Sequence, residues 1–566
     1  MKKLNRNSRA NGKNIMKRAG AIALAAFLAL TMLPGCGAKT DKESLQQTEG
    51  SSPEETDFVY DPDKASWQQD TSPLELEWFV AYDWADLSFD PENNKFDEYV
   101  YTNTGITIKF TIGSQEKLNV LMATESLPDL VTYDAASMER VSLEESGQLL
   151  PLDELKEKYA PDMQVPQAQI DWYTNAKDGH WYSLVGYFYD LEDTYARGGY
   201  IETHNMNFAR KDIMEDLGID PASMNTKEGF IAALQKVKDA NVTYNGQTVI
   251  PYIGDEVEFL AEQFGMDRES KEGELLNAKR QPEFLEALLF LNEIYAKGLT
   301  TDEIFTMDTT LRRQLVSSGS VFAGTRHNYL NGKDTLFYAD PDALMIGTGL
   351  ITGDSGKEAY ISPSPTGGWA ATMITSNCKN PQRAAALLSF MTQPEISLSY
   401  YYGGIDGYDI IDGKAIIKPE REAERTADTT AFNAKYRSTV QDLVCDYVWV
   451  NAYEPTETLD AMGLDKVAYT EKWVNGHIFD GKIFTDVAPE AGSDLAAISA
   501  QLNAYWGQQF PMIVMAKTPE EATQLYNDTI AQMDIMGMAD LDAYQNERFQ
   551  ENKKKMGLDF AWPRNQ

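Results

Sequence analysis

The feature that most constrains the fold of this chain is a regular alternation of strand-like and helix-like segments that begins at residue 74. Residues 74–80, 106–112 and 128–132 have the apolar, β-branched and aromatic composition of strands. The residues between them predict helices over 95–104 and around 115–124. Strand and helix units of this length are typical of a parallel sheet with helices on its faces. Because ligands of such sheets collect at the carboxyl ends of the strands, the loops that follow the strands are the place to look for a binding site.

Aromatic and acidic residues occupy those loops. Tyr82, Asp83 and Trp84 follow the first strand, and Tyr133 and Asp134 follow the third. A sugar ring packs its C–H face on an aromatic ring, and its hydroxyl groups need directional partners such as carboxylate and guanidinium groups. The combination therefore favours a selective and reversible sugar site. Core packing is the alternative interpretation of each aromatic residue, and a solvated surface position is that of each acid.

The segment around residue 180 is where we place the passage into a second lobe, which the family resemblance described below implies. A turn at Asp178 and Gly179 leads to a strand-like stretch over 180–185 and then to an aromatic cluster that contains Tyr187. We place the first crossing between the two lobes at this cluster.

Beyond this crossing the pattern predicts a second α/β lobe. Its expected elements are helices over 207–218, 226–240 and 282–297 and strands over 248–253 and 320–324. Gly218 is expected to close the first of these helices. Asp255 and Glu256 follow the first strand, and Arg326 and His327 follow the second. The second lobe therefore also places polar residues after its strands.

The chain is then expected to return to the first lobe. A loop over 361–368 precedes a strand that begins at Trp369, and Asn380 is predicted to cap the next helix, which begins with a proline. We place a third crossing in the glycine- and tyrosine-rich stretch 400–408. From there to residue 566 the pattern is mostly helical.

The N-terminus has the features of an export signal. Seven basic and no acidic residues precede or flank an apolar run from Ala21 that is too short to span a bilayer as a stable helix. The run ends in Leu33-Pro34-Gly35-Cys36, which resembles the lipobox of bacterial lipoproteins, although proline departs from the usual alanine or serine. By this resemblance residues 1–35 are a signal peptide and Cys36 carries the lipid, palmitate included. An ordinary secretory signal or an uncleaved anchor is the alternative.

A polar segment follows the cysteine. Residues 36–71 are rich in Ser, Thr, Gln, Asp, Glu and Pro and have few groups to bury, which predicts a disordered tether. Such a tether would let a folded body turn toward a membrane partner, although a spacer left over from export has the same composition.

The charge and the cysteines limit the partners and the compartment. The formal net charge of −37 disfavours nucleic acid and anionic lipid surfaces, and suits an extracytoplasmic protein. Apart from Cys36 the chain has only Cys378 and Cys445, too few for a disulfide framework. Two buried thiols are the favoured interpretation, and a pair between them is the alternative.

Several segments, in this order along the chain, resemble a known family. They are TNTGITIKFTI, LPDLVTYD, GQLLPLDELKEKYAP, DGHWYSLVGYFYD and NFARKDIMEDLGI, followed by SPTGGWAATMITSNCKNPQRAAALLSFMTQPE, and they cover about residues 72 to 405. The set is similar to the solute-binding lipoproteins of sugar ABC importers, the maltose-binding-protein-like class.

The resemblance implies a periplasmic-binding-protein-like α/β fold of the class II type, with two lobes, crossover strands and a ligand cleft. It places the N-terminal lobe in 72–186 and 360–404 and the C-terminal lobe in 187–359 and 405–566. It implies a monomer at the outer face of the bacterial cell membrane that passes a sugar to an ABC permease. We expect no cofactor, and no metal site is identified, with a structural calcium ion as the open alternative. The ligand contacts it implies are Tyr82, Asp83, Trp84, Tyr133, Asp134, Tyr187, Asp255, Glu256, Arg326, His327, Trp369 and Trp449.

Other functions remain to be weighed. A secreted glycoside hydrolase would need two carboxylates at a defined separation, and 87 acidic residues neither exclude nor select such a pair. Zinc-protease and nucleophile-elbow motifs are absent from the sequence, and the acidic stretch 90–98 lacks the central glycine of an EF-hand, so we interpret it as a helix start capped by Asp90. A lipoprotein that senses or adheres could share the same body.

Overall fold

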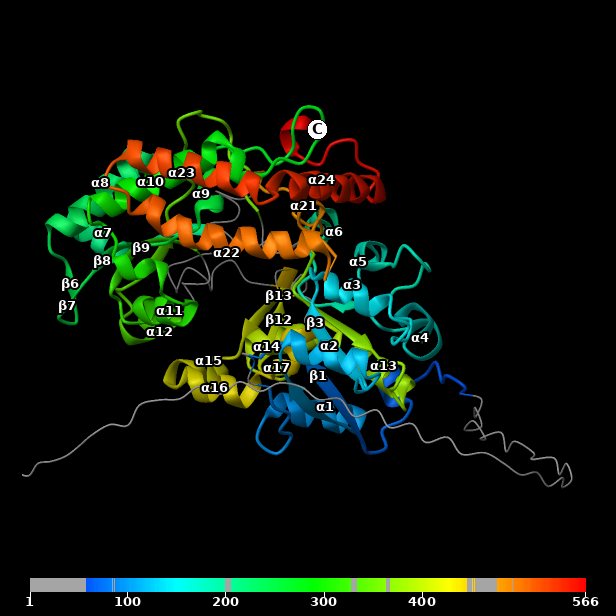
Figure 1. Cartoon of the computed structure of the whole chain (residues 1–566). Helices are drawn as coiled ribbons and strands as arrows, with labels where there is room; N and C mark the ends of the chain where they lie inside the picture. The colour runs from blue at the N-terminus through cyan, green and yellow to red at the C-terminus, as the bar shows by residue number, and fades with distance from the viewer. Residues whose placement is uncertain are drawn as a thin grey trace, which may run out of the picture. The chain divides into compact units, whose positions relative to one another are not determined.

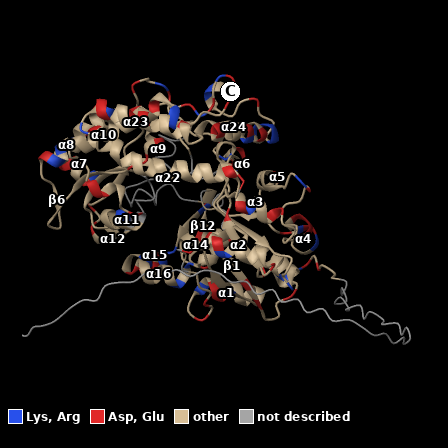
Figure 2. Ribbon diagram, in the orientation of Figure 1, with Lys and Arg blue, Asp and Glu red and all other residues tan. Residues whose placement is uncertain are grey.

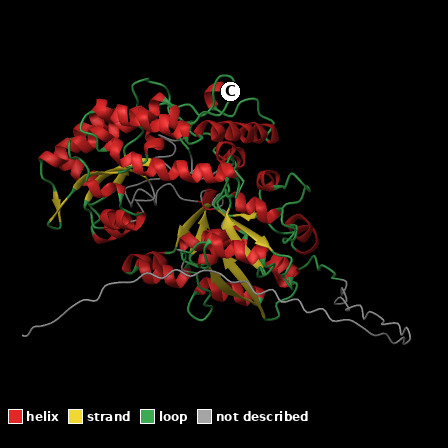
Figure 3. Ribbon diagram, viewed as in Figure 1, coloured by secondary structure: helices red, strands yellow, loops and turns green. Residues whose placement is uncertain are grey.

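The computed structural model of the chain describes residues 58–83, 85, 87–198, 205–326, 333–362, 367–444, 450, 452–453, 476–490 and 492–566. Within them, two separate sheets carry helices on their faces, and two short hairpins lie beside them (Figures 1 and 3). Residues Tyr60 to Gln566 belong to one unit. The alternation of strands and helices therefore gives the α/β architecture that the sequence predicts.

The first sheet has five strands in the order β2-β1-β3-β11-β4. Their bounds are β1 Leu74–Val80, β2 Ile106–Ile112, β3 Leu130–Asp134, β4 Leu184–Val185 and β11 Ala370–Ile374. β1 runs parallel to β2 and β3, whereas β11 runs antiparallel to β3 and β4. A strand from late in the chain is thus inserted in the sheet, as expected for the class II type.

Helices cover this sheet and share one hydrophobic core with it. They are α1 Lys95–Thr104, α2 Gln115–Ala123, α3 Met138–Glu144, α4 Leu152–Tyr159, α5 Gln167–Tyr173 and α13 Pro381–Met391. At the centre of the core Trp78 is fully buried, and its indole donates to Thr132 Oγ1 at 2.8 Å. The indole N–H is therefore paired inside an otherwise apolar surrounding, as buried polar groups usually are.

Two helix caps differ from the sequence prediction. The cap of α1 is Asn94, whose side chain accepts from the backbone of Phe96 and Asp97, whereas Asp90 organises the preceding turn. Asn380 occupies the cap position of α13, but its side chain accepts no hydrogen bond from the helix. Cap residues recur in turns, so composition alone does not locate the helix start.

The second sheet has the order β10-β5-β9-β8. Its strands are β5 Asn205–Arg210, β8 Ile250–Ile253, β9 Val321–Arg326 and β10 Met345–Gly347. β8 runs parallel to β9, and β5 runs antiparallel to β9 and β10. The helices around it are α7 Lys211–Leu217, α8 Lys227–Asp239, α9 Val257–Gln263, α10 Pro282–Ala296, α11 Thr309–Ser317 and α12 Lys333–Ala339.

The helix predicted over 207–218 is wrong in its first third. Residues up to Arg210 form β5, and the helix begins at Lys211. Met206, Phe208 and Ala209 are buried, and β5 pairs with a strand on each side. Sheet pairing on both edges thus outweighs local helical propensity. Gly218 ends α7 in the left-handed conformation, as predicted, with a φ of 60°.

The third crossing falls later than predicted. Residues 400–408 lie on α14 (Pro394–Tyr402) and at the start of a hairpin of β12 (Tyr408–Ile411) and β13 (Lys414–Ile417), followed by α15 (Pro419–Ala427), α16 (Thr429–Tyr436) and α17 (Thr439–Val444). α17 packs on β11, and its Val440, Leu443 and Val444 join the first core. Residues 405–444, expected in the second lobe, therefore extend the first lobe.

Four more α-helices follow residue 481 in the described part of the chain, and the second and third of them join the second core. They are α21 Lys482–Thr485, α22 Asp494–Val514, α23 Pro519–Ile535 and α24 Met538–Lys555. Ile513, Val514 and Tyr526 pack into the core beneath the second sheet. Among the residues that the structure describes, no helix is long and apolar enough to cross a membrane.

The tether predicted over 36–71 ends earlier than expected. A 3₁₀ turn at Ser66–Gln68 attaches to the first lobe: the Ser66 amide donates to Asp162 Oδ2 at 2.8 Å, and Trp67 packs edge-on against Phe390. Cys36 and the signal segment lie outside the described residues. Cys378 is a free buried thiol, and burial raises its pKa to about 12. Cys445 is outside the described ranges.

Candidate ligand-binding site

Four strand ends bring sequence-predicted residues to one edge of the first sheet. Tyr82 follows β1, Tyr133 and Asp134 end β3, Tyr187 follows β4, and Trp369 precedes β11. β11 runs opposite to β3 and β4, so its start lies beside their ends, and Ala370 pairs with Asp134. The loops that the sequence singled out in the first lobe therefore converge, as the parallel topology requires.

Trp369 is at the centre of an aromatic platform, which we define as Tyr82, Tyr187 and Trp369. The Tyr82 ring stacks on Trp369 with centroids 5.1 Å apart and planes 22° apart. The Tyr187 ring meets Trp369 edge-on at 6.1 Å and 63°. Trp369 and Tyr187 are only partly buried, whereas Tyr82 is buried. The platform is preorganised by ring contacts that are favourable beyond the buried area alone.

Backbone contacts fix the position of Trp369. Its amide donates to Gly186 O at 3.0 Å, and its carbonyl accepts from the Ala135 amide at 2.8 Å. The preceding Gly368 has a φ of 84°, and a Cβ there would lie 2.3 Å from Val185 Cγ1. Glycine at this position is what allows β11 to start against β4.

The titratable groups of this edge are protonated phenols and one partly buried carboxyl. Burial raises the pKa of Tyr133 to about 12 and raises the pKa of Tyr82 further. Burial also raises the pKa of Asp134, although the Ala136 amide donates to its carboxylate at 2.9 Å. Neutral phenols both donate and accept hydrogen bonds, and a carboxylate accepts, which is the set that sugar hydroxyl groups need.

Asp442, which the sequence analysis did not predict, binds the Tyr187 side chain of the platform. Its carboxylate accepts from Tyr187 Oη at 2.8 Å and from Tyr400 Oη at 2.9 Å. Burial raises the pKa of this carboxyl group. Tyr187 has a φ of 61°, a costly conformation for a non-glycine residue. Nothing in the local sequence signals this contact, because Asp442 is 255 positions from Tyr187.

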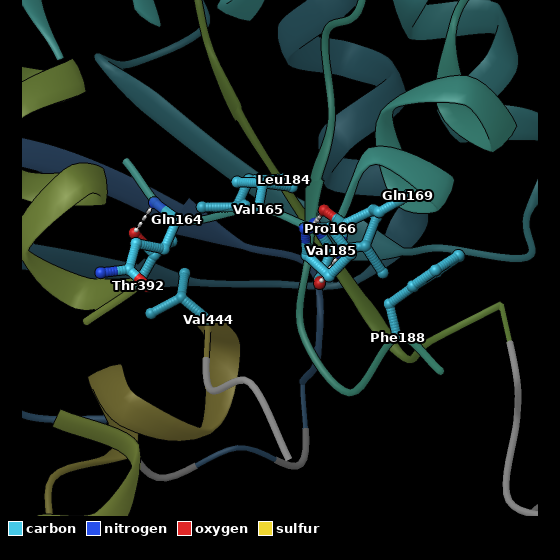
Figure 4. Close-up of a pocket in the computed structure, with 9 residues that line it drawn as sticks. All are labelled: Gln164, Val165, Pro166, Gln169, Leu184, Val185, Phe188, Thr392 and Val444. Carbon is cyan, nitrogen blue, oxygen red and sulfur yellow. Dashed lines mark hydrogen bonds between the residues drawn. The ribbon is translucent and has the colours of Figure 1, made fainter. Parts of the chain in front are cut away.

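A small cavity beside the end of β4 is structural. The side-chain amide of Gln169 accepts from the Val185 amide at 3.0 Å and donates to the Val185 carbonyl at 2.9 Å (Figure 4). The cavity next to it, also lined by Phe188 and Val444, has a volume of about 10 Å³. It holds one water molecule at most, so a solute must bind elsewhere.

The acidic residues predicted in the second lobe are bound to protein groups. Arg312 is buried and donates to both carboxylate oxygens of Asp255, at 2.6 and 2.7 Å. Glu256 accepts from Thr325 Oγ1 at 3.3 Å. The first contact joins α11 to the end of β8, and the second joins the ends of β8 and β9. Asp255 and Glu256 therefore help to hold the second lobe together.

The other predicted residues are placed only in part. Asp83 is exposed in the turn after Tyr82. Arg326 is the last residue of β9, and its side chain is outside the description. Trp84, His327 and Trp449 lie outside the described residues.

The sequence of the chain is similar to one family of known proteins. Residues 95–411 match the model of a family described as bacterial extracellular solute-binding protein. A search of the curated proteins finds no significant match.

Solved structures match over most of the chain. One is the Streptococcus pneumoniae ABC-transporter substrate-binding protein FusA in complex with kestose, at 17% identity and a TM-score of 0.61, covering 85% of this chain and 100% of that one. The alginate-binding protein AlgQ2 without calcium is also 17% identical, with a TM-score of 0.62 and coverages of 86% and 100%. An HMO-binding protein from Bifidobacterium longum infantis has 14% identity, a TM-score of 0.59 and coverages of 85% and 99%. At these identities the likeness shows a shared fold.

Proposed function

The chain belongs to the bacterial extracellular solute-binding proteins, and from this premise we propose that it is the sugar-binding subunit of an ABC importer. The observation that carries the proposal is the aromatic platform, set at the edge of the first sheet where such folds bind ligands. The solute is a mono- or oligosaccharide, and the partner is a membrane permease.

The chemistry of the platform favours a carbohydrate over an amino acid or a metal ion. The partly exposed ring of Trp369 suits the C–H face of a sugar, and Tyr133 and Asp134 lie at the same sheet edge with groups for its hydroxyls. The proteins named above for kestose and alginate share the fold, which is consistent with this choice.

The proposed mechanism is capture by closure. A sugar bound by one lobe presents its other side to the second lobe, and bending at the three crossings encloses it. Closure is favoured only by the extra affinity of the closed state for the ligand over that of the open state. The permease recognises the closed form.

We further propose that Cys36 anchors the protein by a lipid at the outer face of the cell membrane. The basic N-terminal region and the lipobox-like sequence support this. A myristoyl-length single chain gives only reversible attachment, so a lipoprotein anchor with several chains is needed for stable binding.

We propose binding without catalysis. A glycoside hydrolase needs two carboxyl groups flanking the scissile bond, with one free to donate a proton. At the platform both Asp442 oxygens already accept phenol hydrogen bonds, so this carboxyl group holds the aromatic rings.

A thermal-shift screen of the purified protein against mono- and oligosaccharides tests the proposal. A ligand that binds only the folded state raises the melting temperature by mass action. We expect one sugar class to raise it with no cleavage product on chromatography. Turnover of glycans would favour the hydrolase, and no shift with any sugar would point to another solute or to a sensing role.

A further inference from the structure

A second cavity lies in the second lobe, and none of the residues that line it belongs to the aromatic platform. Its volume is about 240 Å³. α9, the segment 268–279 and helices α21 to α24 contribute its walls (Figure 1). At ~30 Å³ per water molecule, the cavity has room for roughly eight waters, and so for a small organic molecule.

The floor of this cavity is apolar and belongs to two separate clusters. Leu502, Met533 and Leu541 come from the cluster where α22, α23 and α24 meet. Phe484 and Val487 come from a second cluster around α21 and the C-terminal residues. The cavity therefore lies between the two clusters. An apolar group bound between the two clusters would make dispersion contacts with both, and these contacts would stabilise it there.

The rim carries a cation that forms no close ion pair within the described residues. Lys279 is half-buried, and its ammonium group has no hydrogen bond or ion pair to any residue in the described ranges. The Lys279 ammonium nitrogen lies 5.5 Å from the centroid of the Trp506 ring. Burial lowers the pKa of Lys279, and the nearby carboxylates of Glu258 and Asp542 offset only part of this effect.

The neighbouring carboxylates are already engaged. Glu258 accepts from Arg268. Asp542 accepts from Asn277 at 2.6 Å through one oxygen and from Arg280 at 2.8 Å through the other. The Nε atom of Arg268 is also enclosed without a hydrogen-bond partner. Both carboxylates therefore bond to other partners, and neither forms an ion pair with Lys279 in the described part of the chain.

From this arrangement we propose that the cavity is a second ligand site, for an amphipathic monocarboxylate. The carboxylate would pair with the Lys279 ammonium, and a short aliphatic or aromatic body would fill the space over Leu502, Met533 and Leu541. This inference is independent of the proposed sugar site, since no lining residue belongs to the platform.

Isothermal titration of the purified protein with octanoate, and with octanol as the neutral analogue, tests the proposal. We expect octanoate to bind, and Lys279→Gln to weaken it roughly tenfold by removing a charge-assisted hydrogen bond while leaving octanol unchanged. The matched control is Lys271→Gln, because Lys271 is exposed on the same segment and does not line the cavity.

A blocking variant gives a second and independent arm. Ser499 is half-buried on α22 and lines the cavity, so Ser499→Trp should fill it and abolish binding of both compounds, whereas Ser499→Ala should not. Trp369→Ala should leave octanoate binding intact. Failure of octanoate to bind the unaltered protein, or equal binding to Lys279→Gln, would overturn the proposal, as would unchanged binding to a folded Ser499→Trp variant.

Discussion

At the scale of single residues, the proposed site depends on Trp369, a side chain that is fixed in position but only partly buried. Trp369 is fixed by two backbone hydrogen bonds and by Tyr82, while part of its surface remains accessible. A ring in this state needs no reordering when a ligand arrives, so its contact energy is available for binding.

Trp369→Ala should therefore weaken sugar binding at least tenfold while the protein stays folded. An aromatic stacking surface contributes on the order of 1 kcal/mol or more to binding, and tenfold corresponds to about 1.4 kcal/mol. Titration calorimetry with the sugar found in the screen gives the affinity, and circular dichroism checks the fold. Tyr101→Ala, which removes an exposed ring on α1, is the control. Unaltered affinity in the Trp369 variant would remove this residue from the site.

Glu262 illustrates a different residue-scale effect, a buried acid on α9. Its side chain accepts from Ser362 N at 2.9 Å and from Ser362 Oγ at 2.6 Å, and burial raises its pKa from 4.5 to about 7. The folded state thus holds this proton more tightly than the unfolded state does. Between pH 4.5 and about 7 the contribution of Glu262 to stability must fall as the pH rises.

Glu262→Gln should flatten that part of the stability profile. The full effect of the shift is about 3 kcal/mol in the free energy of unfolding. Urea unfolding at a series of pH values measures it, with the unaltered protein as reference. If both proteins lose the same stability between those pH values, Glu262 does not titrate as the structure implies.

At the scale of elements, the site depends on how β11 and α17 meet the end of β4. Two adjacent glycines before β11 differ in what they tolerate. Gly368 has a φ of 84° and no room for a Cβ, whereas a Cβ on Gly367 would lie 3.5 Å from its nearest neighbour, at ordinary contact distance.

We expect Gly368→Ala to destabilise the protein by about 1–3 kcal/mol and to weaken sugar binding, because the left-handed backbone strains a side chain and Trp369 must shift. Gly367→Ala, one position earlier, should change both quantities little. Denaturant unfolding and calorimetry on the two variants compare them directly. Equal effects at the two positions would show that backbone geometry there does not set the platform.

Asp442 connects α17 to the residue that follows β4. Asp442→Ala would leave two phenol hydroxyl groups without their acceptor, at a cost of about 1–3 kcal/mol each if they remain buried. We expect weaker sugar binding as well, because Tyr187 loses the contact that orients it. A double-mutant cycle of Asp442→Asn with Tyr187→Phe measures the coupling, and Tyr400→Phe separates the second hydrogen bond. Strictly additive effects on affinity would mean that Asp442 does not act through Tyr187.

At the scale of the whole molecule, the proposed function depends on the acidic composition and on closure at the three proposed crossings. Acidic residues occur along the helices of both sheets, in line with 87 acids against 50 bases (Figure 2). Such a charge disfavours contact with anionic surfaces, which is consistent with the lipid anchor that we propose at Cys36.

Closure predicts a ligand-dependent change in size. The sugar that raises the melting temperature should also lower the radius of gyration measured by small-angle X-ray scattering, because the enclosed state is the one with extra ligand affinity. The Trp369→Ala variant at the same sugar concentration is the control, and it should stay at the ligand-free value. A saturated protein with an unchanged radius would argue against closure.

The sequence by itself determined the alternating elements of this protein and the loops that carry its candidate ligand contacts. β1, β2 and α1 have the predicted bounds because their periodicity is strong and local. The family resemblance added the two-lobed fold and the extracellular binding role, which the family match bears out. Tyr82 lies after β1, as predicted, whereas Tyr133 and Asp134 form the end of β3 rather than the loop after it, and Trp369 precedes β11 rather than starting it.

Only the tertiary structure decided which of those loop residues meet and which serve the fold. Asp255 looked like Asp134 in sequence, but a buried arginine 57 positions away takes both its oxygens. Residues 207–210 became a strand because two neighbours pair with them, and α17 joined the first core although it follows the stretch that looked like a hinge. These outcomes depend on contacts between residues far apart in the chain, and such contacts leave no trace in local composition or periodicity.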